Sequence, residues 1–206
     1  MQENGTEPAT RGRPLSSELD EAILEAACTV LARQGYRGFS FDAVARTAGT
    51  TRPAIYRRWT NRDELLLATL DHAMRIEGAP ADIHLTFAAL PDADLLAAFE
   101  EMALTFARIV SEPRASAVSI SVSAAMYEDD ALRALAQSHH YDRRRPLEDM
   151  MHLLCDRGLL RRDIPVADLI HALVGAVHYR SSMMLEAIND AYVVNVVRLM
   201  TRPARD

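Results

Sequence analysis

The sequence contains no lysine, because all 23 of its basic residues are arginine. This absence excludes enzymes that depend on a lysine amine, such as Walker-type nucleotide hydrolases, Schiff-base aldolases, pyridoxal-phosphate enzymes and protein kinases. The motifs GxSxG, HExxH and GxGxxG, which mark other common catalytic folds, are missing as well. These absences favour a protein that is not an enzyme.

Cysteines and long apolar runs are scarce too. Cys28 and Cys155 lie far apart and form no CxxC pair, so we expect no disulfide framework and a reducing, cytoplasmic environment. No run approaches the ~18 apolar residues of a membrane span, and residues 1–13 lack the apolar core of a secretory signal. The seven histidines gather no acid or cysteine into a metal-ligand set, so neither a metal nor another cofactor is expected.

The formal net charge of -6 conceals an uneven distribution of charges along the chain. Residues 11–62 contain nine arginines and five acidic residues, whereas the chain from residue 63 onward contains fourteen arginines and 22 acidic residues. A basic N-terminal quarter on an acidic remainder is typical of a head that binds a polyanion and a body that keeps it in solution. The alternative at this point is a chance clustering of solvated charges.

The basic segment shows the pattern of three short helices followed by a longer one that runs to about residue 78. Residues suited to helix N-caps begin these segments: Ser16 or Ser17, Ser40, Thr51 and Asn61. Apolar residues recur within each segment every three or four positions. Gly35 is placed to end the first helix, and Gly49 lies in a tight turn between the second and the third. Two short helices joined by such a turn describe a helix-turn-helix, whose second helix enters the major groove of DNA.

Seven short motifs follow one another between residues 11 and 70. They are Gly12-Arg13-Pro14, Ile23-Leu24-Glu25-Ala26-Ala27, Gln34-Gly35-Tyr36, Ser40-Phe41-Asp42-Ala43-Val44-Ala45, Ala48-Gly49, Ala54-Ile55-Tyr56-Arg57-Arg58-Trp59 and Asn61-Arg62-Asp63-Glu64-Leu65-Leu66. In this order they resemble the TetR family of transcriptional regulators, with one departure at Thr50-Thr51, where the family often has Val-Ser. The resemblance implies an all-α homodimer with a three-helix DNA-binding head and a helical body for ligand binding and dimerisation.

The candidate DNA-binding residues lie on the third helix, at the start of the next helix and on the N-terminal arm. They are Thr51, Arg52, Pro53, Ala54, Tyr56, Arg57, Arg58, Arg62, Arg11 and Arg13. Arg52 and Arg57 offer the paired donors that match guanine, and Pro53 and Ala54 can contact a thymine methyl group. The resemblance assigns Tyr56 to a phosphate.

The remaining candidates are expected at the DNA backbone or in the minor groove. Thr51 and Arg62 lie at helix N-termini, which favour phosphate, and Arg58 can serve either phosphate or structure. Arg11 and Arg13 flank Gly12 on an arm that can follow the minor groove. The alternative is a solvated face with local ion pairs, such as Arg62 with Glu64 or Arg37 with Asp42.

The rest of the chain predicts further helices and an all-α fold. Apolar spacing places helices at residues 92–110, 115–127 and 129–157, the last with a break near Pro146. Alternating apolar residues leave a strand open for 115–127, although the context favours a helix. One helix begins at Pro165, and another spans residues 192–200.

The last two helices are apolar nearly all round, so each must be covered on two sides. Packing on their own subunit and on a partner would form a two-fold four-helix interface, whereas the alternative is a buried helix in a monomer. The candidate interface residues are Leu169, Leu173, Val177, Val193 and Val197. A cavity for a small hydrophobic or amphipathic ligand is also expected. Its candidate lining residues are Phe99, Met102, Phe106, Met126, Met150, Met151, Val174 and His178.

Three segments follow from this reading: a flexible basic arm at residues 1–14, the helix-turn-helix domain at 15–61, and the ligand-binding and dimerisation domain at 62–206. The leading hypothesis is a homodimeric repressor that leaves its double-stranded DNA operator when a small molecule binds. A regulator without a ligand and a helical enzyme are the alternatives. The second would show no salt-dependent binding of DNA.

Overall fold

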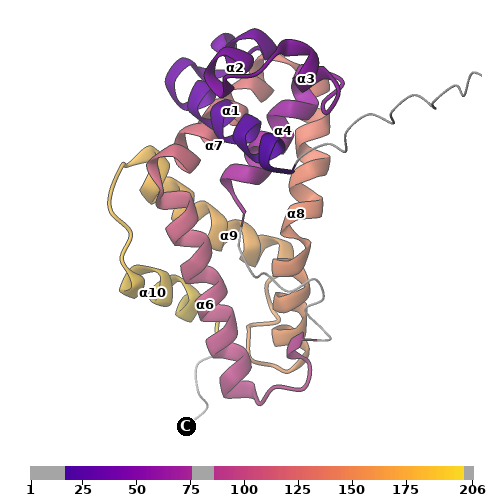
Figure 1. Ribbon diagram of the computed structural model, residues 1–206. Helices are drawn as coiled ribbons and strands as arrows, with labels where there is room; N and C mark the ends of the chain where they lie inside the picture. The colour runs from indigo at the N-terminus through magenta and orange to yellow at the C-terminus, as the bar shows by residue number, and fades with distance from the viewer. Residues whose placement is uncertain (1–16, 76–85, 202–206) are drawn as a thin grey trace, which may run out of the picture.

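The computed structural model describes residues 17–75 and 86–201 (Figure 1). Its helices are α1 (Ser17–Gly38), α2 (Phe41–Ala48), α3 (Arg52–Tyr56), α4 (Arg62–Ala73), α6 (Asp92–Ser111), α7 (Pro113–Glu128), α8 (Asp130–Asp156), α9 (Val166–His178) with the π-helical turn η1 (Tyr179–Met183), and α10 (Asp190–Met200). No β-strand occurs in these two ranges, where Leu160 and Thr201 form an isolated bridge. The predicted all-α fold is confirmed, and residues 115–127 are helical. The predicted arm, residues 1–14 with Arg11 and Arg13, lies outside the described residues.

The helices of the head begin and end at residues whose local chemistry requires it. Gly35 interrupts α1 with a positive φ of 63°, and Gly49 ends α2 with a φ of 64°, a region that favours glycine. The Ser40 hydroxyl accepts the amide of Ala43 at 3.2 Å and so caps α2. The Asn61 side chain accepts the amide of Glu64 at 2.8 Å. These short-range features set the helix boundaries of the head.

The head packs around an apolar core that α1, α2, α3 and α4 share. Ile55 and Trp59 face inward as predicted, with exposed fractions of 0% and 9%. Other buried members are Ile23, Ala27, Leu31, Phe39, Val44, Leu65, Leu66 and Leu70. Because α3 has only five residues, its position depends on this packing rather than on its own hydrogen bonds.

The body consists of α6 to α10, and two of its helices reach the head. In Figure 1, α7 lies below α1, and α8 runs along one side of the molecule from the head to the far end of the body. The predicted break in α8 is wrong, because the helix is continuous through Pro146. Pro146 and Asp142 are both exposed, so water can reach the carbonyl that the missing amide leaves free. In the head, α4 ends at Ala73, earlier than predicted; residues 76–78 lie outside the described residues.

The five residues predicted for the dimer interface form part of the core of the subunit instead. Leu169, Leu173, Val177, Val193 and Val197 are at most 3% exposed, because α9 and α10 turn these faces toward each other, α6 and α8. The prediction of these residues as interface residues is therefore wrong. The exposed apolar side chains of this region lie elsewhere: Tyr179, Met183, Met184, Leu185 and Leu199.

Candidate nucleic-acid interface

The α3 helix divides its short length between the core and the surface. Arg52, Pro53, Tyr56 and Arg57 are exposed, as an interface with DNA requires. Ala54 is 5% exposed and packs inward, so the prediction that it contacts a thymine methyl group is wrong. Ala54 and the next residue, Ile55, are both buried and attach α3 to the core of the head. Thr51 takes the N-cap position and is exposed.

Arg52 is held in place by two partners on the surface of the head. Its guanidinium donates to the carboxylate of Asp42 at 3.1 Å and to the hydroxyl of Tyr56 at 2.9 Å. The Tyr56 ring packs edge-on against Phe41, with 4.4 Å between ring centroids. The hydrogen bond from Arg52 to Tyr56 raises the pKa of the guanidinium, which stays charged. Phe41 and Asp42, at the start of α2, therefore hold the side chains of Tyr56 and Arg52, which are candidates for contact with DNA.

Arg62 occupies the first position of α4 and stacks on Tyr36. Its guanidinium carbon lies 4.1 Å from the ring centroid, and the group also donates to the Tyr36 hydroxyl. The charge is thus placed at a helix N-terminus, where backbone amides favour an anion. The ion pairs suggested between Arg62 and Glu64 and between Arg37 and Asp42 do not form in the described part of the chain. Arg37 pairs with Glu128 instead, and Asp42 pairs with Arg52.

Arg58, also predicted to bind DNA, belongs to the interior of the head. Its side chain is 6% exposed, pairs with Asp20 of α1 and donates to the Ala54 carbonyl at 3.0 Å. The Arg58 side chain therefore ties α3 to α1 and is not available to a phosphate. The sequence alone cannot distinguish this role, because Asp20 lies 38 positions away.

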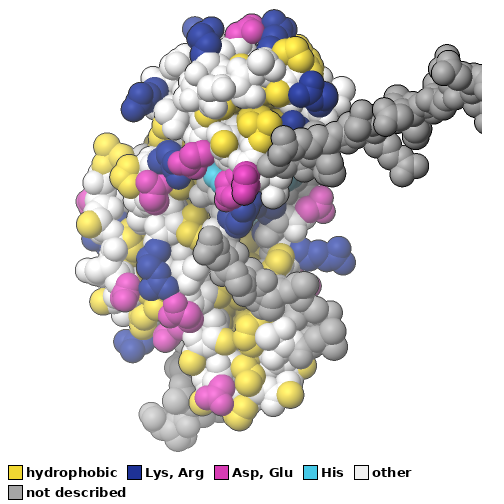
Figure 2. Space-filling view, viewed as in Figure 1, with side chains coloured by type: hydrophobic (Ala, Val, Ile, Leu, Met, Phe, Trp, Pro, Cys, Tyr) yellow, Lys and Arg dark blue, Asp and Glu magenta, His cyan; other side chains and the backbone are white. Residues whose placement is uncertain are grey.

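The surface of the head is richer in arginine than that of the body. Figure 2 shows arginine side chains over the head, at the top of the molecule, whereas most acidic side chains of this face lie below it. This arrangement agrees with the charge asymmetry of the sequence. The arginine side chains give the surface around α3 a positive charge, which attracts a polyanion.

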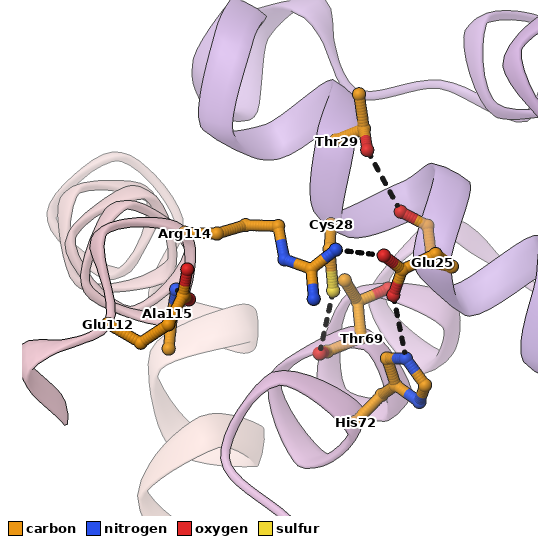
Figure 3. A network of polar contacts seen from close by, with 8 residues as sticks. All are labelled: Glu25, Cys28, Thr29, Thr69, His72, Glu112, Arg114 and Ala115. Carbon is orange, nitrogen blue, oxygen red and sulfur yellow. Dashed lines mark hydrogen bonds and ion pairs between the residues drawn. The ribbon is translucent and has the colours of Figure 1, made fainter. Parts of the chain in front are cut away.

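A polar network joins the head to the body (Figure 3). Arg114 of α7 pairs with Glu25 of α1, and His72 at the end of α4 contacts the same carboxylate at 3.2 Å. Burial alone would raise the pKa of Glu25, but the hydrogen bonds from Arg114 and His72 outweigh it and lower the pKa. The neighbouring Cys28 thiol points to the Thr69 carbonyl, and burial raises its pKa to about 11. A protonated, buried thiol fits a structural role.

Two further arginines hold the head on the body. Arg143 of α8 donates to the Met74 carbonyl at 3.0 Å and pairs with Asp71 at 3.1 Å, so it binds the last turn of α4. Arg37 pairs with Glu128 at the far end of α7, at 3.0 Å. Sequence reasoning missed the contacts of Arg143 and Arg37, because they join residues more than 60 positions apart.

The eight residues predicted to line a ligand pocket differ in burial. Phe99, Met150 and Met151 are fully buried, and Phe106 packs edge-on against His178 with 5.9 Å between ring centroids. Burial, together with the charge of His140, lowers the pKa of His178. A cavity of about 360 Å³ lies instead between α6 and α10, and its described lining residues include none of the eight predicted ones.

Two other properties concern the described ranges alone. In residues 17–75 and 86–201, no helix combines the length and the apolar character that crossing a membrane requires. In the same ranges, no three histidine, cysteine or acidic side chains come together in a way that could hold a metal ion.

The chain is similar to known regulators along most of its length. The family described as "Bacterial regulatory proteins, tetR family" matches residues 23–69, and "Tetracyclin repressor-like, C-terminal domain" matches residues 90–200. The DNA-binding transcriptional repressor TetR of Mycobacteroides abscessus is 50% identical over 50 residues, which are 24% of this chain and 26% of that protein. The uncharacterized HTH-type transcriptional regulator YdeS of Bacillus subtilis is 22% identical over 192 residues, 91% of this chain and 90% of that one.

Solved structures share the fold. The fatty acid degradation regulator FadR of Bacillus halodurans superposes with a TM-score of 0.70 at 14% identity, over 92% of this chain and 97% of that one. A TetR transcriptional regulator of Agrobacterium tumefaciens gives a TM-score of 0.64 at 16% identity, over 91% and 97%. The two family matches cover both the helix-turn-helix and the body, and the family is one of regulators rather than enzymes. The chain therefore belongs to the TetR family of DNA-binding transcriptional regulators.

Proposed function

We propose that this chain is a homodimeric, cytoplasmic repressor that binds a double-stranded operator through α3 and leaves it when a small molecule binds the body. The observation that carries the DNA-binding part is the division of α3. Ala54 and Ile55 anchor the helix in the core, while Arg52, Tyr56 and Arg57 project from it. A rigid helix that presents arginine forks is suited to reading guanine in the major groove.

We assign the same three segments to this function. The arm at residues 1–14 would follow the minor groove, residues 15–61 would hold the DNA, and residues 62–206 would bind ligand and partner. Thr51 and Arg62 would contact phosphates, and Pro53 a thymine methyl group. A symmetric dimer would place two α3 helices about 34–36 Å apart, one turn of DNA, or a multiple of that distance.

The exposed apolar side chains beyond α9 and on α10 support the dimer. Met183 is 72% exposed, Leu185 81% and Leu199 75%, in a region where the neighbouring faces are fully packed. A second copy that covers them would bury apolar surface that otherwise faces water. The interface would then lie on these residues and not on the buried faces of α9 and α10.

The experiment compares binding to a duplex selected from random DNA with binding to its scrambled version. Arg52→Ala should weaken specific binding by about 1–3 kcal/mol and relax the choice at one base position. Tyr56→Phe should weaken binding to both duplexes alike. Arg33→Ala, which removes an equal charge from α1, is the matched control. Equal losses on both duplexes for Arg52→Ala would leave Arg52 only a phosphate contact.

A ligand-independent regulator is the second candidate, and one observation favours it. Three of the residues predicted to line a ligand pocket, Phe99, Met150 and Met151, are fully buried. Such a regulator would respond only to its own concentration. Its operator affinity would stay the same over a panel of small molecules, whereas a ligand-released repressor would lose affinity with at least one of them.

A further inference from the structure

The cavity between α6 and α10 has the volume of a small-molecule site and is open to solvent, since its lining residues Arg108, Ser111, Glu112 and Asp190 are exposed. Its volume of about 360 Å³ lies within the range of roughly 300–1,000 Å³ that such sites occupy. Leu104 and Ala107 of α6 line it together with Ile188 and Val193, which lie before and on α10. These walls are apolar, so the cavity suits a molecule with a hydrocarbon part.

The charged groups of the cavity leave an excess of negative charge. Arg108 lines it, but the Arg108 guanidinium is already bound by Glu101 on the same helix. Glu112 and Asp190 line it as well, and within residues 17–75 and 86–201 neither forms an ion pair with an arginine or a histidine. Two carboxylates beside an apolar wall favour a ligand that carries a positive charge.

The wall of the cavity and the contact with the head share one helical turn. Glu112 caps α7, because its carboxylate accepts the amide of Ala115 at 2.6 Å. Two residues further on, Arg114 pairs with Glu25 of α1, and Figure 3 shows both groups in one view. His72 of α4 contacts the same Glu25 carboxylate. A shift of the first turn of α7 therefore reaches both α1 and α4.

We propose that the α6–α10 cavity is an effector site for a small organic cation with an apolar tail, coupled to the DNA-binding head through Glu112, Arg114 and Glu25. A cation beside Glu112 competes with the Ala115 amide for its carboxylate, which loosens the first turn of α7 and moves Arg114. This inference rests on the proposed release by a ligand, and it names the site and the charge of that ligand.

The binding test uses hexyltrimethylammonium as the probe, titrated calorimetrically into the full chain. Saturable binding is expected, and Asp190→Asn and Glu112→Gln should each weaken it by about fivefold, the upper end for a solvent-accessible ion pair. The glutamine keeps an oxygen that can cap α7, so the helix is preserved. Asp94→Asn, at the start of α6, removes an equal charge away from the cavity and should change nothing.

Two further measurements separate charge from shape. Ser111→Trp, at an exposed lining position, should block the probe without disturbing the core. The neutral 1-hexanol should bind more weakly than the cation. Equal binding of the two molecules, or unchanged affinity in both charge variants, would overturn the proposal. So would the absence of probe binding, the result expected if a second copy of the chain covers the cavity.

The coupling test measures duplex affinity with and without saturating probe. We expect the probe to lower the affinity for the selected duplex by about tenfold, within the usual range of allosteric coupling. Arg114→Gln should still bind the probe but lose this response. Arg37→Gln, which breaks the ion pair with Glu128, should keep it.

An affinity for DNA that stays constant while the probe is bound would overturn the coupling, and so would a normal response of Arg114→Gln. Failure of the proposed function would look different. The chain would then bind no duplex even without the probe, while calorimetry would still report on the cavity.

Discussion

Arg58 and Arg52 lie six positions apart, and the structure buries the first side chain and exposes the second, a difference that a pair of substitutions can test. The Arg58 side chain is 6% exposed, whereas that of Arg52 is 52% exposed. Arg58→Met keeps the aliphatic stem but removes the charge-assisted bonds to Asp20 and to the Ala54 carbonyl. Each such bond contributes roughly 1.5–3 kcal/mol when buried. Because Asp20 is 39% exposed and water can solvate it, we expect a net loss of about 2 kcal/mol.

This loss should be visible in thermal denaturation. For a chain of this size, 1 kcal/mol lowers Tm by roughly 2–4 °C, so Arg58→Met should melt about 4–8 °C lower than the parent chain. Arg52→Ala breaks an exposed ion pair with Asp42 and an exposed hydrogen bond to Tyr56. Because contacts at the surface contribute about 1 kcal/mol or less, Tm should fall by about 4 °C or less. Protomer concentration must be held equal, since dimerisation itself shifts Tm.

Duplex binding at a temperature well below both transitions gives the complementary result. Arg58→Met should keep the parent affinity within about twofold, since the folded head is unchanged, whereas Arg52→Ala should lose about 1–3 kcal/mol. The reasoning is refuted if Arg58→Met melts like the parent chain and yet loses affinity for DNA. Arg58 would then contact a phosphate, as the sequence alone suggested.

Three other predictions follow from burial and charge. The pKa of Glu25 lies below its ordinary value of 4.5, so the stability that its contacts contribute is lost as pH falls through and below that value. Glu25→Gln should therefore flatten the acid side of a pH–Tm curve, and an unchanged curve would contradict this. Cys28 has a pKa of about 11 and is buried, so its thiol should react with Ellman's reagent at about pH 8 only as fast as the head unfolds. The measurement uses a Cys155→Ser background, and rapid labelling of the native chain would contradict the burial of Cys28. Leu199→Glu should yield folded monomers in sedimentation, whereas Leu173→Glu should unfold the chain; persistent Leu199→Glu dimers would place the interface elsewhere.

Short-range signals predicted most of the head. The cap residues Ser40 and Asn61 and the turn residues Gly35 and Gly49 act on amides and dihedral angles within a few positions, so they can be read from the sequence directly. The same holds for the spacing of four that brings Arg52 to the Tyr56 hydroxyl. These are interactions whose partners the local geometry of a helix already determines.

Long-range packing determined the remaining assignments. Helical periodicity showed that α9 and α10 carry broad apolar surfaces, but it could not tell which side the subunit covers and which it leaves exposed. For the same reason Ala54 was predicted to contact DNA, and Arg58 was left open between a phosphate contact and a structural role, although the core and Asp20 hold both inside.

By itself, the sequence determined the all-α class, the helix-turn-helix and the basic sign of the head, because each depends on neighbours along the chain or on composition. Only the tertiary structure decided which arginines face solvent, where a cavity lies and how Arg114 joins the head to the body. Arg114 and Glu25 are 89 positions apart, and only the packing of α7 against α1 brings such distant groups into contact.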